Sequence, residues 1–121
     1  MFSTNFGLLL LRLGFSGMLL THGIPKLMQL FQGEIGFPDP LGIGSGFTLV
    51  LTVIGEAICP ILIILGLKTR WVAIPPIITM LVAAFIVHGS DPIEKKELAL
   101  LYAFGFIAIA LLGGGKFVLK K

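Results

Sequence analysis

Four apolar stretches of membrane-spanning length constrain this chain more than any other feature. They cover about residues 5–24, 47–67, 71–88 and 92–112, and a helix needs about 20 apolar residues to cross a bilayer. Charged residues make up 12% of the chain and the mean hydropathy is +1.05, whereas soluble domains carry about 25% charged residues. The sequence therefore predicts an all-α integral membrane protein, a four-helix transmembrane bundle forming a single domain over residues 1–121.

The first apolar stretch reads as a retained helix and not as a signal peptide. No Lys or Arg precedes it, Arg12 interrupts it, and no Ala-x-Ala site follows it. Gly23 and Pro25 are expected to end or kink this helix, since proline lacks a backbone donor. Pro60 predicts a kink in the second helix. The glycine- and proline-rich residues 33–46 are expected to form a loop outside the membrane.

The basic residues predict an orientation and exclude some classes of partner. Five of them fall on the side that holds both termini and three on the other: Lys68, Arg70, Lys116, Lys120 and Lys121, against Lys26, Lys95 and Lys96. The positive-inside rule then places both termini of this multi-pass chain in the cytoplasm. No basic run is present, so we expect no nucleic-acid partner. A single cysteine, Cys59, excludes an internal disulfide.

Arg12 and Glu56 are ionisable residues inside apolar helices, where a charge needs a partner. At 1.5 Å per residue, Arg12 lies roughly 10 Å and Glu56 roughly 16 Å from the cytoplasmic edge. A long arginine side chain spans that difference, so we predict a buried ion pair between them. The pair is read either as structural, fixing the register of the two helices, or as functional.

Four polar residues are predicted to share a layer near the outer interface: His22, Lys26, His88 and Glu97. The same arithmetic places both histidines roughly 25 Å from the cytoplasmic side. These residues are the candidates for ligand binding or proton transfer, and the alternative is that the histidines only hydrogen-bond their neighbours. Ligand spacing such as HxxxH is missing, so we expect no metal site.

The small residues receive structural interpretations. Gly7, Gly14 and Gly17 of the first helix are expected to permit close helix packing. Cys59 is expected to be a small buried apolar residue. Thr52 is expected to bond the backbone of its own helix.

A set of short motifs in a fixed order resembles one known family. The motifs are Arg12-Leu-Gly, His22-Gly-Ile-Pro-Lys26-Leu27, Gly55-Glu56, Leu65-Gly-Leu-Lys-Thr-Arg70, His88-Gly89, Glu97-Leu-Ala-Leu-Leu-Tyr102 and Leu112-Gly-Gly-Gly115. Together they resemble the DoxX family over nearly the whole chain. The resemblance implies a small bacterial inner-membrane protein with four helices. Some relatives in that family are linked to redox chemistry: the DoxD and DoxA subunits of a thiosulfate:quinone oxidoreductase, and membrane complexes of thiol stress and superoxide defence.

The resemblance implies a subunit of a quinone-linked membrane redox system, whether or not the chain is itself catalytic. A quinone or a similar apolar ligand would enter between the helices, and the resemblance leaves the identity of any cofactor open. The alternative is a non-enzymatic protein, either a small-solute transporter or a structural assembly subunit. The expected partners are the lipid bilayer and either copies of the chain or other membrane subunits. Cysteines beyond Cys59 are missing, so we expect no sulfur oxidation by this chain alone.

Overall fold

The computed structural model describes residues 2–33, 41–87 and 89–119. Every regular element in these ranges is helical, and two of the helices continue into short π-helical segments, η1 and η2. The elements are α1 (Phe2–Phe31), α2 (Ser45–Val53), η1 (Ile54–Ile58), α3 (Cys59–Leu65), α4 (Thr69–Val72), α5 (Ile74–Val82), η2 (Ala83–Val87) and α6 (Ile93–Leu112). The predicted all-α fold is confirmed.

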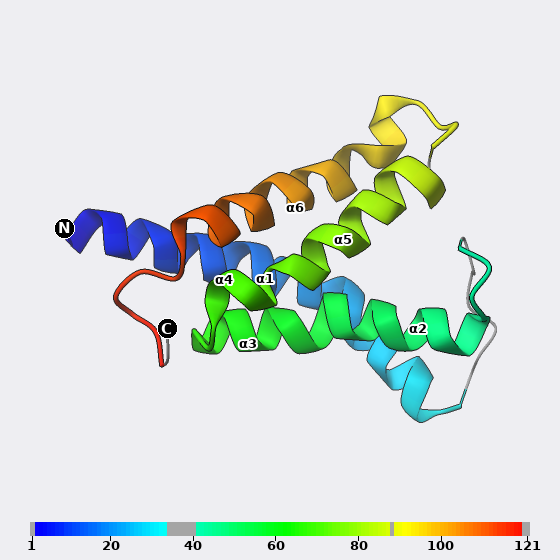
Figure 1. The fold of residues 1–121 in the computed structure, drawn as a ribbon, viewed down its shortest axis with the longest axis horizontal. Coiled ribbons are helices and arrows are strands. Elements are labelled where there is room, and N and C mark those ends of the chain that lie inside the picture. The colour runs from blue at the N-terminus through cyan, green and yellow to red at the C-terminus, as the bar shows by residue number, and fades with distance from the viewer. Residues whose placement is uncertain (1, 34–40, 88, 120–121) are drawn as a thin grey trace.

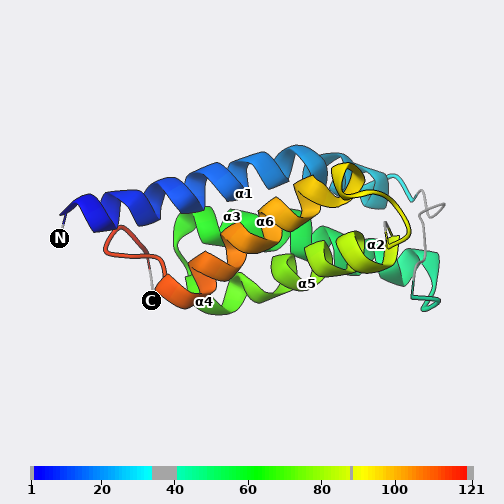
Figure 2. The same ribbon diagram turned by 90° about the horizontal axis from the view of Figure 1, so that it is seen from above.

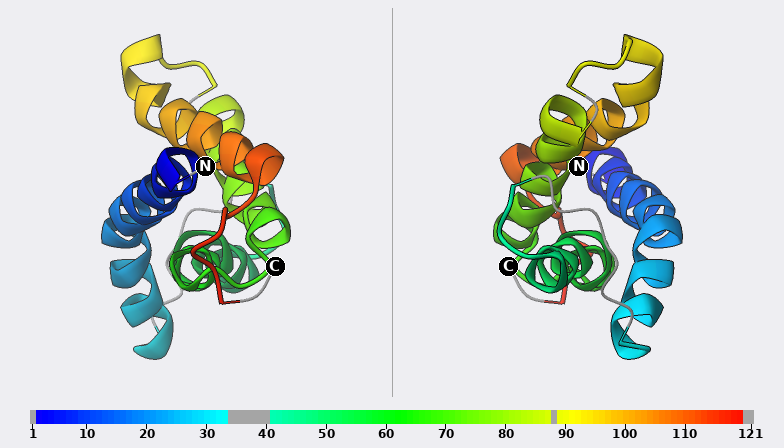
Figure 3. Two further views of the ribbon diagram at one scale, coloured as in Figure 1. Left: turned by 90° about the vertical axis from the view of Figure 1, so that its left-hand side faces the viewer. Right: turned by 90° about the vertical axis from the view of Figure 1, so that its right-hand side faces the viewer.

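These elements form four rods that run in alternating directions (Figure 1). The first rod is α1, the second joins α2, η1 and α3, the third joins α4, α5 and η2, and the fourth is α6. Both ends of the described chain and the turn between α3 and α4 lie at one end of the bundle, which we call the terminal end. The end of α1, the start of α2, the end of η2 and the start of α6 lie at the opposite, far end (Figures 1 and 2). Viewed end on, the rods fan apart toward the far end (Figure 3).

Three of the rods are long and apolar enough to cross a membrane: Ser3–Phe31, Ser45–Leu65 and Thr69–Val87. The fourth rod, α6, has four charged residues in its first turns, at positions 94–97. The segment that follows them, residues 98–112, is uncharged and about 22 Å long. The rod packs against α1 and α5. Large apolar side chains cover the outside of the bundle, as lipid contact requires.

Helix α1 runs further than the sequence predicted. It continues through Pro25 to Phe31 without a break, so the expected end near residue 24 is wrong. A proline removes only its own N–H from the helix, and Pro25 lies on an exposed face. Leu27 and Leu30, in the last turns of α1, pack against a buried cluster on α2 and η1. This packing outweighs the local cost of the proline.

The second rod carries the irregularity that Pro60 predicted. A π-helical turn, η1, ends at Ile58, two residues before the proline. Pro60 has no N–H for the carbonyl of Glu56, four residues earlier, and its ring crowds that carbonyl. A wider turn relieves this conflict, and such π turns commonly occur at functional sites.

Two glycines allow the rods to cross closely at η1. A Cβ at Gly23 would overlap the carbonyl of Glu56 and lie 2.9 Å from the nitrogen of Ala57. A Cβ at Gly55 would overlap the hydroxyl of Thr79 on α5. Gly23 and Gly55 therefore let α1 and α5 approach η1 from two sides. These glycines set the level at which polar side chains of different rods can meet.

The other three glycines of α1 do not pack as predicted. A Cβ added at Gly7, Gly14 or Gly17 would meet no atom within 4 Å. The expectation that they permit close helix packing is wrong. The missing side chains at these three positions leave open space on the surface of α1.

Candidate functional site

Arg12 is buried at the terminal end, where it bonds only backbone carbonyls. Its Nε donates to the carbonyl of Ile63 at 2.9 Å, and its two terminal nitrogens donate to Ile64 at 2.9 Å, Gly114 at 3.2 Å and Phe117. Ile63 and Ile64 belong to the last turn of α3, whose carbonyls carry a partial negative charge; the carbonyl of Ile63 also accepts from the N–H of Gly66 at 3.0 Å. Arg12 therefore caps α3 and ties the segment after α6 to it.

The predicted ion pair between Arg12 and Glu56 is wrong. Glu56, 5% exposed, accepts a 2.6 Å salt bridge from the Nζ of Lys26 instead. Gly23 lies level with Glu56, and Arg12 is eleven residues earlier on α1, roughly 16 Å along the axis. Helical side chains also lean toward the N-terminus of their helix. Arg12 therefore leans away from Glu56, while Lys26 leans back toward it.

The salt bridge lies beside the middle of the second span. Glu56 is eleven residues from Ser45 and nine from Leu65, roughly 15 Å from either end of that span. His22 is adjacent to Gly23 and shares this level. The predicted place of His22 and Lys26 at the outer interface stays a prediction.

The other two members of the predicted layer are not joined to this pair. Glu97 is exposed on α6, and it makes no hydrogen bond or salt bridge to any residue that the structure describes. His88 lies outside the described residues, so its contact with His22 stays a prediction. Of the four predicted site residues, the structure brings His22 and Lys26 to one place and leaves Glu97 away from it.

Tyr102 on α6 joins His22 at this level, and sequence reasoning missed it as a site residue. The two rings meet edge to face, with centroids 6.0 Å apart and planes at 82°. Phe15 and Phe106 pack on the other sides of the Tyr102 ring. Tyr102 is 6% exposed. The sequence did contain a signal for Tyr102 as a site residue. It is the single tyrosine of the chain and lies in the uncharged part of α6, where a hydroxyl usually has a polar partner.

We call His22, Lys26, Glu56 and Tyr102 the polar cluster. Tyr102 also lines an apolar groove of about 410 Å³ between α1 and α6. The groove is lined by Gly7, Leu10, Leu11, Gly14, Phe15, Met18, Leu98, Leu101 and Tyr102. Gly7 and Gly14 stand two turns apart on α1 and leave it empty of side chains. The groove therefore offers an apolar ligand a binding surface on the outside of the bundle, with the Tyr102 phenol beside it.

A double-mutant cycle tests the ion pair of the polar cluster. Lys26→Met should lower the free energy of unfolding by about 1–3 kcal/mol, because it leaves the Glu56 carboxylate buried and unpaired. Glu56→Gln should cost less, since the amide oxygen of glutamine can still accept a hydrogen bond from the Nζ of Lys26. The double variant should be more stable than the sum of the two losses predicts, by about 1–2 kcal/mol. Thermal unfolding in detergent measures each term.

Lys96→Met is the matched control for this cycle. Its Nζ makes a 3.3 Å bond to the carbonyl of Gly89 and lies 6.0 Å from the centre of the exposed Phe85 ring. Both contacts are at the surface, so their loss should change stability little. Strictly additive losses at positions 26 and 56 would contradict the pairing.

Comparison with known proteins adds one match. A family model described as DoxX matches residues 7–89, more than half of the chain. The match includes His22, Lys26 and Glu56, and it stops before α6 and Tyr102. No curated protein and no solved structure matches the chain.

Proposed function

The chain belongs to the DoxX family of membrane proteins, and on that premise we propose that it is a subunit of a membrane redox system that binds a quinone-type ligand. One observation carries the proposal: Tyr102, which lines the apolar groove between α1 and α6, is also a member of the polar cluster and contacts His22. The ligand ring would lie in this groove. Its carbonyl would face Tyr102.

The groove suits a flat apolar ligand from the bilayer. Its volume of about 410 Å³ falls in the range of small-molecule sites, about 300–1,000 Å³. Leu10 and Met18 line it and are more than half exposed on the outer surface of the bundle. A ligand dissolved in lipid would therefore reach the groove sideways, without crossing an aqueous phase.

The polar cluster supplies what reduction or oxidation of a quinone needs, namely donors and a route for protons. The Tyr102 hydroxyl makes no hydrogen bond to any residue that the structure describes, and it can donate to a carbonyl in the groove. His22 contacts the Tyr102 ring, and we propose its imidazole as the next group on the proton route. Lys26 and Glu56 complete the cluster. We propose that this salt-bridged pair, a partly exposed lysine and a buried glutamate, passes protons between His22 and the surface of the bundle.

Orientation and assembly complete the proposal. We place the chain in a bacterial inner membrane with both termini cytoplasmic. Lys68, Arg70 and Lys116 gather at the terminal end, while Glu94 and Glu97 stand at the start of α6 at the far end, in keeping with the positive-inside rule. We also propose that the chain works beside copies of itself or other membrane subunits, which would provide the electron donor or acceptor.

Filling the groove tests the proposed ligand. Gly14→Leu places a side chain where no atom lies within 4 Å, so the fold should be unchanged while the bed for the ligand is lost. Lipid extracts of the purified protein should contain quinone for the wild type, and at least about fivefold less for Gly14→Leu. Gly17→Leu is the matched control, because Gly17 is equally open but does not line the groove. Absence of quinone from the wild type, or equal amounts in both variants, would refute the redox proposal.

A structural assembly role is the second candidate, and the openness of the groove favours it. An open groove lined by glycines can also receive a helix of another subunit. In that case, Gly14→Leu would shift the protein to a smaller complex in size-exclusion chromatography, and the wild type would carry no quinone.

A further inference from the structure

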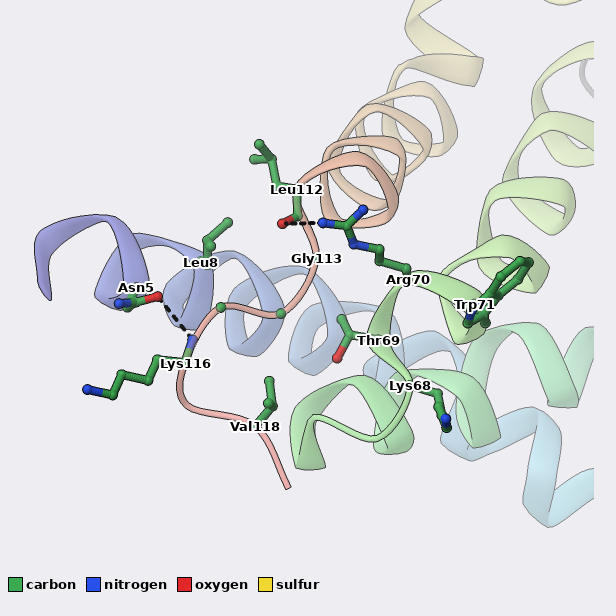
Figure 4. A pocket seen from close by; sticks show the side chains of 12 residues that line it. Asn5, Leu8, Lys68, Thr69, Arg70, Trp71, Leu112, Gly113, Lys116 and Val118 are labelled. Atoms are coloured by element: carbon green, nitrogen blue, oxygen red, sulfur yellow. Dashed lines mark hydrogen bonds between the residues drawn. The ribbon is translucent and has the colours of Figure 1, made fainter. Parts of the chain in front are cut away.

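A second cavity, of about 700 Å³, opens at the terminal end of the bundle and is unrelated to the groove (Figure 4). It lies between the start of the third rod and the segment that follows α6. The lining residues are Asn5, Leu8, Lys68, Thr69, Arg70, Trp71, Leu112, Gly113, Gly114, Gly115, Lys116 and Val118. Because the second span ends at Leu65 and the third begins at Thr69, the cavity lies at the level of the lipid headgroups.

Three cations surround this cavity without a carboxylate to neutralise them. Lys68, Arg70 and Lys116 line it, and no acidic side chain among the described residues does. Glu56 is already paired with Lys26 beside the middle of the second span. The Arg70 guanidinium makes a single long hydrogen bond, 3.5 Å to the carbonyl of Leu112. Most of its N–H groups therefore remain available to an anion.

Thr69 supplies a buried donor at the same place. The residue is 4% exposed, and its Oγ1 has no hydrogen-bond partner among the described residues. A buried hydroxyl without a partner costs about 1–3 kcal/mol, which a bound acceptor would recover. A Cβ at Gly114 would come within 2.8 Å of this oxygen. The absence of a side chain at Gly114 thus leaves space beside this hydroxyl, and Thr69 lines the cavity together with Arg70 (Figure 4).

Three backbone positions around the cavity have positive φ values. Lys68 is the sole non-glycine residue with a positive φ in the described chain, at 51°. Gly113 and Gly115 also have positive φ values, at 80° and 81°. The Nε of Arg70 would be 2.8 Å from a Cβ at Gly113, so the glycine turn lets the guanidinium lie flat against the backbone. Larger residues there would displace Arg70.

We propose that this cavity binds a phosphate group, with Arg70 and Thr69 as its direct ligands and Lys68 and Lys116 as flanking charges. Arginine favours phosphate because its planar N–H groups match two phosphate oxygens at once. The hydroxyl of Thr69 donates to a third oxygen. The phosphate belongs either to the headgroup of an anionic phospholipid or to a small soluble phosphate compound. The site is independent of the groove, since the two cavities share no residue.

Binding to delipidated protein in a non-ionic detergent tests this site. One arm adds phosphatidylglycerol, with phosphatidylcholine as the uncharged-headgroup comparison, and counts retained lipids by native mass spectrometry. The other arm adds inorganic phosphate or pyrophosphate and follows the thermal midpoint. Selective retention of phosphatidylglycerol identifies a lipid headgroup, and stabilisation by the soluble anions identifies a soluble ligand. Binding should also weaken as salt is raised.

Variants at the site separate binding from folding. Arg70→Gln should weaken binding about tenfold or more, and Thr69→Val about three- to tenfold, which are the effects of losing a charged and a neutral donor. Neither should lower stability: Arg70 makes one long bond, and Thr69→Val removes an unpaired hydroxyl while keeping the shape. Lys68→Asn removes a charge with a residue that tolerates positive φ.

Two control variants complete the test. Ser16→Ala removes the other buried hydroxyl without a partner among the described residues, away from the cavity, and should leave binding unchanged. Lys96→Gln removes one positive charge at the far end and should also bind normally. If Arg70→Gln and Thr69→Val bind every probe as the wild type does, or if no probe binds the wild type, the phosphate site is refuted.

Discussion

Replacing Arg12 with leucine should remove most of the folded protein from the membrane. The substitution removes the charged donor from four buried or partly buried carbonyls, of which that of Ile63 keeps the N–H of Gly66. Hydrogen bonds from a charged group contribute about 1.5–3 kcal/mol each. Even with partial relaxation, a loss of about 4 kcal/mol or more is expected, against a total stability of about 5–15 kcal/mol. Protein abundance in membranes and the thermal midpoint in detergent should both fall sharply.

Two comparison variants identify the cause. Arg70→Leu removes an exposed arginine from the same end of the bundle and should change stability by less than about 1 kcal/mol. Combining Arg12→Leu with Glu56→Gln should give additive losses, because the structure assigns these residues to different partners. If the double variant instead regained stability, Arg12 and Glu56 would interact after all, and the capping role of Arg12 would be incomplete.

Gly23→Ala should be the second most damaging single change. Its methyl group would overlap the backbone carbonyl of Glu56, and backbone cannot rotate aside as a side chain can. The two rods must therefore separate at their crossing, at an expected cost of about 3 kcal/mol or more. That separation also pulls Lys26 away from Glu56, so quinone retention should fall together with stability.

Gly17→Ala is the control for this prediction. Gly17 lies in the same helix, where an added Cβ meets nothing within 4 Å. Alanine forms helices better than glycine by about 1 kcal/mol, so this variant should be as stable as the wild type or slightly more stable. Equal destabilisation by both substitutions would mean that helix propensity, and not the crossing, governs the effect.

The fold class was predictable because lipid imposes a simple rule on sequence. A span needs length and apolarity, and both can be counted. The end of α1 could not be counted in the same way. Pro25 is a valid local signal for a break, but the packing of Leu27 and Leu30 against α2 and η1 decides the outcome. That contact joins residues far apart in the chain, which a local pattern does not contain.

The candidate site was predictable in its residue types more than in its pairings. The charges at Arg12 and Glu56 were recognised as needing partners, and both have them, but Lys26 was assigned to a separate outer layer. The depth of each Cα was estimated from helix length, whereas the pairing depends on the direction in which the side chains lean. The groove was not predictable, because Gly14 reads equally well as a packing contact or as an open surface. Only the positions of neighbouring helices distinguish the two.

The capping role of Arg12 also bears on the order in which the protein is made. Two of its acceptors, Ile63 and Ile64, follow it by 51 and 52 residues, and the other two, Gly114 and Phe117, by 102 and 105. At about 5–20 residues per second, the last acceptor emerges roughly 5–20 seconds after Arg12. The first helix must therefore enter the bilayer before the Arg12 guanidinium has all its hydrogen-bond acceptors. The last two acceptors are made only near the end of translation. A chain interrupted before Gly114 would retain that half-satisfied guanidinium, a defect that membrane proteases can use to distinguish unfinished copies from finished ones.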